Sequence, residues 1–316
     1  MDNYFPERNT LVMLWMILIF FSSWSFAQDF SFLLTPAAPP SQLALENMTS
    51  PQEELTNKEG ETKVVHSRFI FGHTVKSEKL DYMIGGNYQH LDFDKNEVLR
   101  DYYQYQLSLG VRKQLPHNRF WFANVSYGTA SDRPFKNSDD DTISANYIRK
   151  TSDKWFFVLN YSNNRSFLND IPIPGFFYVK EAGKEKTTIL GFPFIFVLRN
   201  VGNWSYRYFG LLPWRHQARV SYSKFPKTQP YVGYEQDVFN FFRHDRQEVN
   251  DRVFFFQRKI GLGIDLKLFK AAKVDLFMGH SFDREIFEAK NFSDKKSFRS
   301  RLANTVFIES KISYSF

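Results

Sequence analysis

The sequence has no cysteine and no apolar stretch long enough to cross a membrane as a helix. The absence of cysteine excludes a small secreted domain held together by disulfides. The longest apolar run, Leu11–Phe21, falls short of the roughly 18 residues of a spanning helix, which excludes a helical membrane protein. Aromatic residues make up 18% of the chain while the mean hydropathy is −0.42, so the chain is neither disordered nor uniformly apolar.

The N-terminal segment has the organisation of an export signal. The apolar run Leu11–Phe21 is followed by Ser25-Phe26-Ala27, a small-x-small cleavage site. We therefore predict a signal peptide over residues 1–27, cleaved after Ala27, with an uncleaved anchor as the alternative. Because an exported protein does not meet chromosomal DNA, the formal charge of +7 does not indicate nucleic acid as a partner.

From Lys63 onward, apolar and polar residues alternate with a period of two. In Tyr103–Leu115 the odd positions up to Val111 are apolar, whereas the even positions carry Gln, Ser, Gly and Arg. Successive side chains of a strand point to opposite faces, so this pattern predicts strands with one apolar and one polar face. Thirteen segments follow it: Lys63–Val75, Tyr82–Phe93, Tyr103–Leu115, Phe120–Ala130, Ile143–Lys150, Trp155–Asn163, Thr187–Arg199, Trp204–Phe209, Arg215–Lys224, Tyr231–Phe242, Val253–Leu268, Val274–Asp283 and Leu302–Phe316.

The lengths of these segments and of their connections favour a membrane barrel over a soluble sandwich. Most segments exceed the ~5–6 residues of an ordinary strand and match the ~9–11 residues that a tilted strand needs to cross a bilayer. Long connections such as Ser131–Thr142 and Glu285–Arg299 alternate with short ones such as Pro116–Asn118 and Phe269–Lys273. Transmembrane barrels have short turns at one end and longer loops at the other. We therefore predict an all-β fold, a closed antiparallel up-and-down transmembrane β-barrel.

The last predicted strand ends on Phe316, with Tyr314 two residues earlier. In this ending the chain resembles bacterial outer-membrane β-barrels, whose terminal strand and final aromatic residue act as an assembly signal. Two further segments, Leu190-Gly191-Phe192-Pro193-Phe194 and Gly210-Leu211-Leu212-Pro213-Trp214, resemble an uncharacterised outer-membrane barrel family. The resemblance implies an outer-membrane location, and as partners outer-membrane lipids, lipopolysaccharide and the barrel-assembly machinery, but it brings no activity.

The number of strands and the domain limits follow from the same pattern. Bacterial single-chain barrels have even strand numbers, whereas thirteen candidates are present. We predict about 12 strands in a barrel domain over 63–316, with 14 as the alternative, for which Asp29–Thr35 is a weak additional strand. The proline-rich segment 28–62 is predicted to be a flexible periplasmic leader with a short turn of helix around Ser41–Asn47.

The two faces of the predicted strands have different roles. Aromatic residues near strand ends are expected to form interfacial girdles on the outside, namely Trp155, Tyr161, Trp204, Tyr222 and Tyr314. Charged residues of the polar face are expected to line the lumen, namely Arg112, Arg207, Arg215, Arg219, Lys259, Asp265, Lys267, Asp275, Asp283, Glu309 and Lys311. Further residues on this face are Arg199, Arg301, Glu235 and Asp237.

Two functions remain open at this stage. The polar face fits a narrow passive channel for small solutes, with anions favoured by the slight basic surplus. It fits equally well a non-conducting structural or surface-interaction barrel whose lumen is filled by paired charges, since eight strands fill with side chains and 16–18 leave an open lumen. In the long segment Asn164–Lys186, the rigid apolar stretch Ile171–Tyr178 is expected either to plug the lumen or to pack on the rim.

No sequence motif indicates a catalytic or cofactor site. A lipid-modifying enzyme ranks last, because His66-Ser67 and His280-Ser281 are adjacent in strands and their side chains therefore point to opposite faces. No phosphate loop, nucleophile elbow or metal-spaced histidine set is present, so we expect no enzyme activity, cofactor or metal. The carboxylates of Ser138–Asp141 fit a solvated loop better than a divalent cation site.

Overall fold

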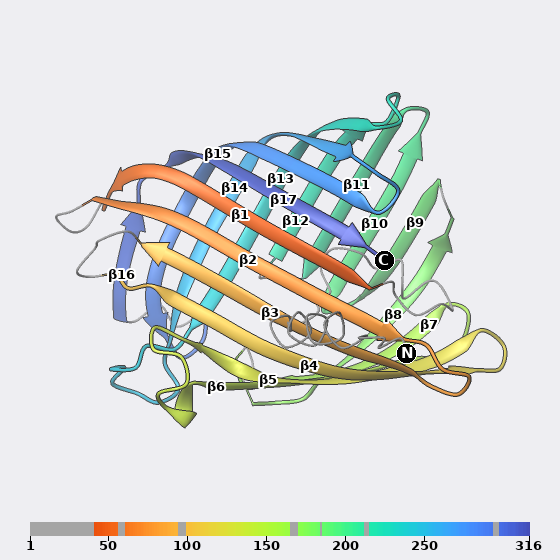
Figure 1. Cartoon of the computed structure of the whole chain (residues 1–316), viewed down its shortest axis with the longest axis horizontal. Coiled ribbons are helices and arrows are strands. Elements are labelled where there is room, and N and C mark those ends of the chain that lie inside the picture. Colours follow the sequence, from red (N-terminus) through yellow and green to blue (C-terminus); the bar gives the residue numbers. More distant parts are fainter. Residues whose placement is uncertain are drawn as a thin grey trace, which may run out of the picture.

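The computed structural model describes residues 41–55, 61–93, 99–164, 170–183, 185–211, 215–292 and 297–316 (Figure 1). The predicted signal peptide and the predicted leader up to residue 40 lie outside the described residues. Within the described residues, no helix combines the length and the apolarity that a membrane crossing requires.

Seventeen strand segments and one 3-10 helix, η1 (Ser138–Asp140), make up the regular structure of this part of the chain. The strands pair antiparallel with their neighbours in the chain, as in an up-and-down barrel, and a single isolated bridge in the described residues, Ser131 with Phe242, is parallel. The strands are β1 (Gln42–Glu54), β2 (Glu61–Val75), β3 (Asp81–Phe93), β4 (Tyr102–Leu115), β5 (Arg119–Ser131), β6 (Asp141–Lys150), β7 (Trp155–Ser162), β8 (Ile173–Ala182), β9 (Lys186–Phe192), β10 (Phe194–Val201), β11 (Trp204–Leu211), β12 (Arg215–Tyr222), β13 (Thr228–Phe241), β14 (Arg252–Lys267), β15 (Ala272–Ala289), β16 (Ser297–Leu302) and β17 (Thr305–Ser315).

The barrel is closed and has 16 wall strands in the described residues. Strand β1 pairs with β2 on one side and with β17 on the other, which joins the two ends of the sheet. Strands β16 and β17 both pair with β15 and form one wall strand interrupted at Ala303 and Asn304. The predicted closed antiparallel barrel is confirmed, but the prediction of about 12 strands, with 14 as the alternative, is wrong.

The first missing strand is β1, which occupies much of the predicted leader. The barrel begins at Gln42 and not at Lys63, and the turn of helix expected around Ser41–Asn47 is absent. The register between β1 and β2 shifts between Thr49 and Gln52, next to Pro51. Proline cannot donate to a strand ladder and is tolerated at such irregularities, so it does not end the strand.

The other missing strands lie between Asn164 and Arg199. The stretch expected to plug the lumen or to pack on the rim contributes instead a wall strand, β8, in which exposed Phe176 alternates with buried Phe177 and Val179. The predicted strand Thr187–Arg199 is two strands, β9 and β10, which separate at Pro193. Together with β1, these account for the difference between thirteen candidates and 16 wall strands.

Connection lengths distinguish the two ends of the barrel. At one end, called here the turn end, short turns such as 116–118 and 202–203 join the strands, and Ser41 and Phe316 lie together there, joined by a 2.9 Å backbone hydrogen bond. At the other end, called the loop end, most connections are longer, as in 132–140 and 242–251. The predicted alternation therefore exists, except at the tight connection between β9 and β10 and at the three-residue connection 212–214 between β11 and β12.

At the loop end, the long strands form a second, smaller ring. The end of β13 pairs with the end of β5, with Phe242 N donating to Ala130 O at 2.7 Å and Asp132 N donating to Phe242 O at 3.3 Å. In the described sheet this contact bypasses the shorter strands β6–β12 and leaves a ring of nine wall strands, β1–β5 and β13–β16. We call this ring the upper tier and the complete 16-strand part the lower tier.

Apolar side chains fill the upper tier. Eight strands enclose just enough space for side chains to fill, and a ring of nine is close to that size. The cluster comes from the strands of that ring and their continuations, namely Met48, Leu55, Val64, Leu91, Phe93, Leu99, Tyr102, Ala130, Tyr231, Phe241, Val253, Phe255, Phe277, Ile286, Leu302 and Phe307. Phe255 packs edge-on against Phe93, and Tyr102 stacks on Phe241, at ring-centroid distances of 5.6 and 5.3 Å.

The outward face of the lower tier is apolar. On β14 and its neighbours, exposed side chains include Leu262 (64% exposed), Met278 and Ile308. Aromatic residues ring the turn end, where Trp155 contacts Tyr178 and Trp204 contacts Tyr222. The predicted girdle residues Trp155, Trp204, Tyr222 and Tyr314 belong to this ring, whereas Tyr161 lies toward the loop end of β7.

The apolar belt ends abruptly toward the loop end. Arg258 on β14 forms an ion pair with Asp283 and a 3.2 Å hydrogen bond with Gln236. Farther along the same surface, Arg301 lies 3.5 Å from Glu285. The outward face therefore changes from apolar to charged within a few residues of Ile260.

Candidate functional site

The inner face of the lower tier has two different walls. On β5–β11 it is apolar and forms a second cluster, namely Met83 of β3 with Phe120, Phe122, Ile148, Phe156, Val158, Phe177, Val179, Ile189, Phe194 and Phe209. On β11–β15, β17, β1 and β2 the inward positions include charged side chains, among them Glu46, Arg68, Arg207, Arg219, Lys259 and Lys311. Two cavities lie along this charged wall.

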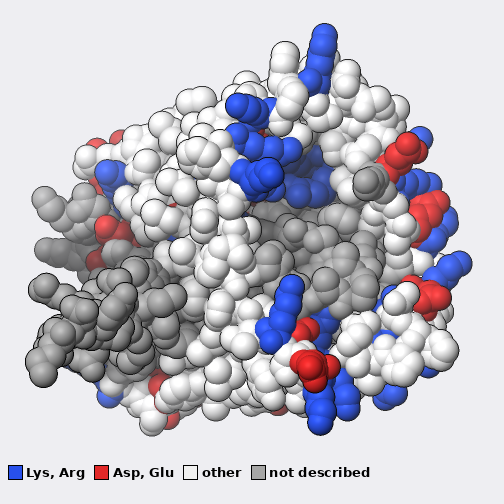
Figure 2. Space-filling view, turned by 45° about the vertical axis from the view of Figure 1, so that its right-hand side comes forward, with Lys and Arg blue, Asp and Glu red and all other residues white. Residues whose placement is uncertain are grey.

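The first cavity, of about 220 Å³, lies toward the turn end. Arg219 lies between two carboxylates at its side, 3.0 Å from Asp265 and 2.8 Å from Asp275. The guanidinium also lies 3.6 Å from the ring centroid of Tyr231, whose hydroxyl donates to Asp275. Figure 2 shows Lys and Arg side chains gathered on the face at this end of the molecule.

The second cavity, of about 210 Å³, lies farther into the barrel and shares Gln217, Glu235 and Glu309 with the first. Between them is Lys259, whose side chain is 4% exposed. Its ammonium contacts three carboxylates, Glu309 at 2.6 Å, Glu235 at 2.9 Å and Asp237 at 3.2 Å. This ion cluster separates the two cavities.

Further ion pairs line the second cavity. Glu46 of β1 accepts from Lys311 at 2.6 Å and lies 3.6 Å from Arg68 of β2. Arg215 lies 3.5 Å from Asp237. The two cavities together are lined by eight Lys and Arg side chains and six Asp and Glu side chains, so a small positive surplus remains.

The structure places ten of the eleven residues expected to line the lumen on the inner face. Nine of them line a cavity: Arg207, Arg219, Asp265, Lys267, Asp275, Glu309 and Lys311 in the first, with Arg215, Lys259 and Glu309 in the second. Arg112 lines neither cavity and is buried with its guanidinium 4.2 Å from the ring centroid of Phe120. Asp283 lies on the outside, opposite Arg258.

The exception of Asp283 has a local cause. The register of β14 and β15 shifts between Phe256 and Arg258, and Asp283 has a φ of 49° at this bulge. A bulge moves the following residues to the opposite face, so alternation counted along the sequence fails there. Arg199 and Arg301 are also outside. The chain turns at Pro193, so the inward positions of β10 are even-numbered, such as Phe196, and Arg199 faces out. Arg301 contacts Glu285 on the outer surface.

Sequence reasoning missed four residues of the site. Glu46 was assigned to the leader, and His66, Arg68 and Lys273 were not selected. The signal for the last three was the alternation itself, since each occupies an inward position of its strand. His66 and Ser67 face opposite sides, as Ser67 accepts a hydrogen bond from Asn47 at 3.0 Å while His66 lines the second cavity.

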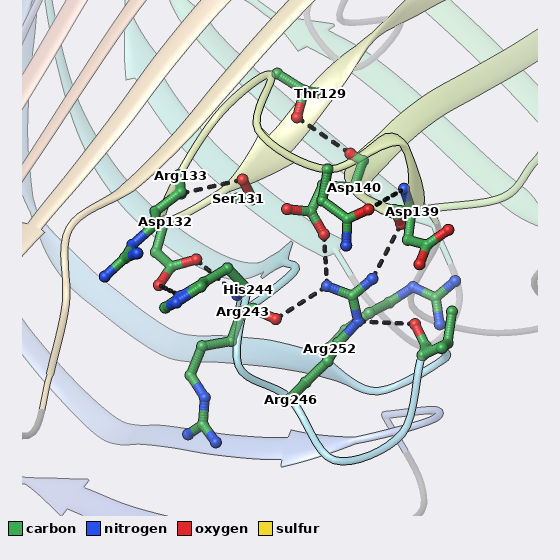
Figure 3. A network of polar contacts seen from close by, with 12 residues as sticks. Thr129, Ser131, Asp132, Arg133, Asp139, Asp140, Arg243, His244, Arg246 and Arg252 are labelled. Atoms are coloured by element: carbon green, nitrogen blue, oxygen red, sulfur yellow. Dashed lines mark hydrogen bonds and ion pairs between the residues drawn. The ribbon is translucent and has the colours of Figure 1, made fainter.

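Two loops meet over the loop end and hold the upper tier together. We call the contact between 132–140 and 242–251 the clasp (Figure 3). Arg246 forms an ion pair with Asp140, and their side chains are 3% and 0% exposed. The Arg246 guanidinium also donates to the backbone oxygens of Arg243, Val249 and Asp139 at 2.8–3.1 Å.

The burial of Asp140 corrects the expectation of a solvated acidic loop. Asp140 belongs to η1, whose N-cap Asn137 accepts a hydrogen bond from Asp139 N, and the turn directs Asp140 inward toward Arg246. Asp141 accepts a hydrogen bond from Tyr127 at 2.6 Å. The carboxylates of Asp140 and Asp141 thus have separate protein partners, while the Asp139 side chain is exposed, so the three do not form one cation site.

A second part of the clasp gathers Asp132, His244 and Asp245, whose possible ligand atoms lie within 4.8 Å of one another. Arg100 lies among them, 2.9 Å from Asp132, 2.7 Å from Asp245 and 3.1 Å from His244 Nδ1. Its guanidinium supplies the positive charge that a metal ion would bring. These three residues are therefore a binding place for an arginine of the same chain.

The charges of the clasp shift the titration of its groups. The hydrogen bond to Asp132 raises the pKa of the Arg100 guanidinium above its ordinary value. Burial raises the pKa of the Asp245 carboxyl, but the hydrogen bond from Arg100 and the charges of Arg243 and Arg100 outweigh it and lower that pKa below its ordinary range. Asp245 is therefore ionised, and its pair with Arg100 is present, at neutral pH.

No family model and no curated protein matches the sequence. Among solved structures, an outer membrane channel from Pseudomonas putida F1 is 8% identical, with a TM-score of 0.37 over 89% of this chain and 97% of that chain. The outer membrane protein Omp33 of Acinetobacter baumannii is 8% identical, with a TM-score of 0.37 over 89% and 100%. The toluene transporter TodX of P. putida is 8% identical, with a TM-score of 0.39 over 92% and 94%. The structural neighbours are thus bacterial barrel proteins, while the closed barrel of this chain is established by its own strand pairing.

Proposed function

We propose that this protein is an outer-membrane β-barrel whose lower tier forms a narrow channel for small solutes, and whose upper tier and clasp keep it closed at rest. The membrane part rests on the apolar belt of the lower tier. In hydrocarbon every backbone polar group needs a partner, and pairing β1 with both β2 and β17 leaves no sheet edge. The exposed Leu262 and Met278 then face lipid, and the turn-end aromatic ring lies at an interface.

If the apolar belt lies in the membrane, an arginine introduced there should lower the stability of the barrel in lipid vesicles. Leu262→Arg is expected to destabilise the barrel by about 2–4 kcal/mol in lipid vesicles, the range for arginine at the midplane of a bilayer. Phe269→Arg, in the exposed turn between β14 and β15, should cost about 1 kcal/mol or less because it lies at the interface. Urea titration of both variants in vesicles measures the difference, and equal costs would reject the membrane position.

The observation that carries the channel is the pair of charged cavities in series. Both are lined by charged side chains. Gln217, Glu235 and Glu309 line both cavities, and the Lys259 ammonium contacts Glu235 and Glu309 between them. A lumen with no transport role has no need of such space, whereas the upper tier is filled by apolar side chains. The small positive surplus in the lining favours anions.

The second candidate is a non-conducting barrel that acts through its loops. It is favoured by the clasp and the filled upper tier, which close the loop end over the cavities. Neither candidate assigns a catalytic role. In both, outer-membrane lipids and lipopolysaccharide surround the belt, and the C-terminal strand with Tyr314 and Phe316 presents the assembly signal.

Conductance in planar bilayers separates the two candidates. We expect rare, small conductance steps from the refolded full chain. Replacing Arg243–Asp251 by a flexible Gly-Ser linker should give frequent, larger steps, because the linker cannot form the clasp that closes the loop end. A control chain carries the same linker length in the 76–80 turn at the other end. If the replacement leaves a folded barrel, judged by its circular dichroism, and no steps occur in either protein, the channel is excluded and the non-conducting barrel stands.

A further inference from the structure

Ion pairing in the first cavity leaves a positive surplus at one place. All four of its carboxylates have cationic partners, Asp265 and Asp275 on Arg219, and Glu235 and Glu309 on Lys259. Lys267 and Lys273 line the same cavity, and neither ammonium has an ion-pair partner among the described residues.

These two lysines face each other directly. Lys267 of β14 and Lys273 of β15 are register partners, two pairs beyond Asp265 and Asp275, and all four side chains lie on the inner face. Like charges directly opposite on neighbouring strands destabilise a sheet. An anion held between the two ammonium groups would remove this repulsion.

Two aromatic side chains of neighbouring strands also line the cavity. Phe196 of β10 and Phe209 of β11 line it, and Phe209 belongs to the second apolar cluster. The cavity therefore offers two kinds of wall to one ligand, a cationic wall at the mouth and an aromatic wall beside it.

The size of the cavity limits the ligand. Its volume of about 220 Å³ exceeds the ~150 Å³ of a cavity that holds benzene and is below the ~300 Å³ at which pockets for drug-sized ligands begin. One ring or a short chain with a single carboxylate fits this space. A phosphate or acetate ion would meet the lysines but leave the aromatic wall uncovered.

We propose that the first cavity binds a small organic carboxylate with an apolar body, its carboxylate between Lys267 and Lys273 and its body against Phe196 and Phe209. This inference names a solute class for the proposed channel and in that sense rests on it. The binding itself needs no conduction, so the two can be tested separately. Charge-assisted hydrogen bonds and apolar contact supply the recognition.

Calorimetric titration of the refolded full chain with benzoate tests the site. We expect benzoate to bind about tenfold tighter than the neutral benzamide, which lacks the charge, and than acetate, which lacks the ring. The double variant Lys267→Gln with Lys273→Gln should lose about tenfold or more in benzoate affinity. Lys270→Gln removes one charge from the turn between the same strands without lining the cavity, and should bind as wild type.

Two further measurements show whether the proposed site is wrong. Both lysines are exposed at the mouth, so the double variant should keep the wild-type circular dichroism, and Phe196→Ser provides a second probe that should weaken benzoate but not acetate. The inference is overturned if wild type binds no benzoate, if benzamide binds equally well, or if the double variant keeps wild-type affinity. Binding without conductance removes only the channel, and conductance without binding removes only this site.

Discussion

Replacing Asp140 by alanine is expected to make the loop Arg243–Asp251 cleavable by trypsin in the folded protein, about a hundredfold faster than in wild type. The Arg246 guanidinium is buried in the clasp against the Asp140 carboxylate. Removing one partner of a buried ion pair leaves an uncompensated charge and costs about 3–5 kcal/mol. This free energy destabilises the closed loop relative to the open loop. The fraction of molecules whose loop is open and cleavable therefore rises. Timed digestion, with the cut after Arg246 identified by mass spectrometry, measures it.

Asp139→Ala is the matched control for this prediction. Asp139 lies in the same 3-10 turn, but only its backbone oxygen contacts Arg246, and its side chain is exposed. Its loss removes an equal charge and leaves the buried pair intact, so cleavage should stay near the wild-type rate. Equal cleavage of the two variants would mean that the Arg246–Asp140 ion pair does not keep the loop Arg243–Asp251 closed.

Replacing Lys259 by methionine is expected to lower the free energy of unfolding by about 3–5 kcal/mol. Methionine keeps the length of the side chain but leaves Glu235, Asp237 and Glu309 facing one another without their shared ammonium. Three carboxylates, one buried and two partly buried, then repel one another in a space of lower dielectric constant than water. Urea titration in detergent, followed by circular dichroism, gives the free energy.

Lys267→Met serves as control on the same strand and the same face. Lys267 is exposed and has no ion-pair partner among the described residues, so its loss should change stability by no more than about 0.5 kcal/mol. Adding Glu309→Gln to Lys259→Met should recover part of the loss, because one of the three repelling charges is gone. A Lys259→Met protein as stable as the Lys267→Met protein would show that the ammonium does not hold the carboxylates.

The sequence predicted the strands best where a crossing has an apolar outward face along its length. β4 and β14 are of this kind, with Leu107, Leu109, Ile260 and Leu262 exposed on the outside. β1 was missed because its outward face turns polar beyond Leu45, where the strand rises above the belt. A strand segment outside the membrane does not need apolar residues on its outward face, so the alternation of apolar and polar residues is lost there.

Proline and aromatic residues hid the remaining strands. β8 begins beside Pro172 and Pro174, which indicated a loop, and β9 and β10 connect through Phe192, Pro193 and Phe194 without a polar turn residue. The omission of β8 and of the division between β9 and β10 both fall between Asn164 and Arg199. Together they add two strands to the predicted number. The order of long and short connections therefore stayed correct while the strand count did not.

The charged inner face was accessible from the sequence, but its pairing was not. Alternation fixes the face of Arg219 or Lys259 without any knowledge of the neighbouring strands. Their partners depend on the stagger between strands, which no local pattern specifies, and on bulges such as that at Asp283. The clasp was beyond reach for a similar reason, since Asp132 and His244 meet across 112 residues and no periodicity marks the contact.

The unequal strands also decide how wide the molecule is at each height. All sixteen wall strands enclose the lumen near the turn end, but only nine continue into the upper tier, so among the described residues the lumen narrows through strand length alone. Strand length, and not strand number alone, therefore sets the diameter. Lengthening the seven shorter strands, β6–β12, would widen the narrow section. The lengths of these strands are therefore what an engineered form of this barrel should change.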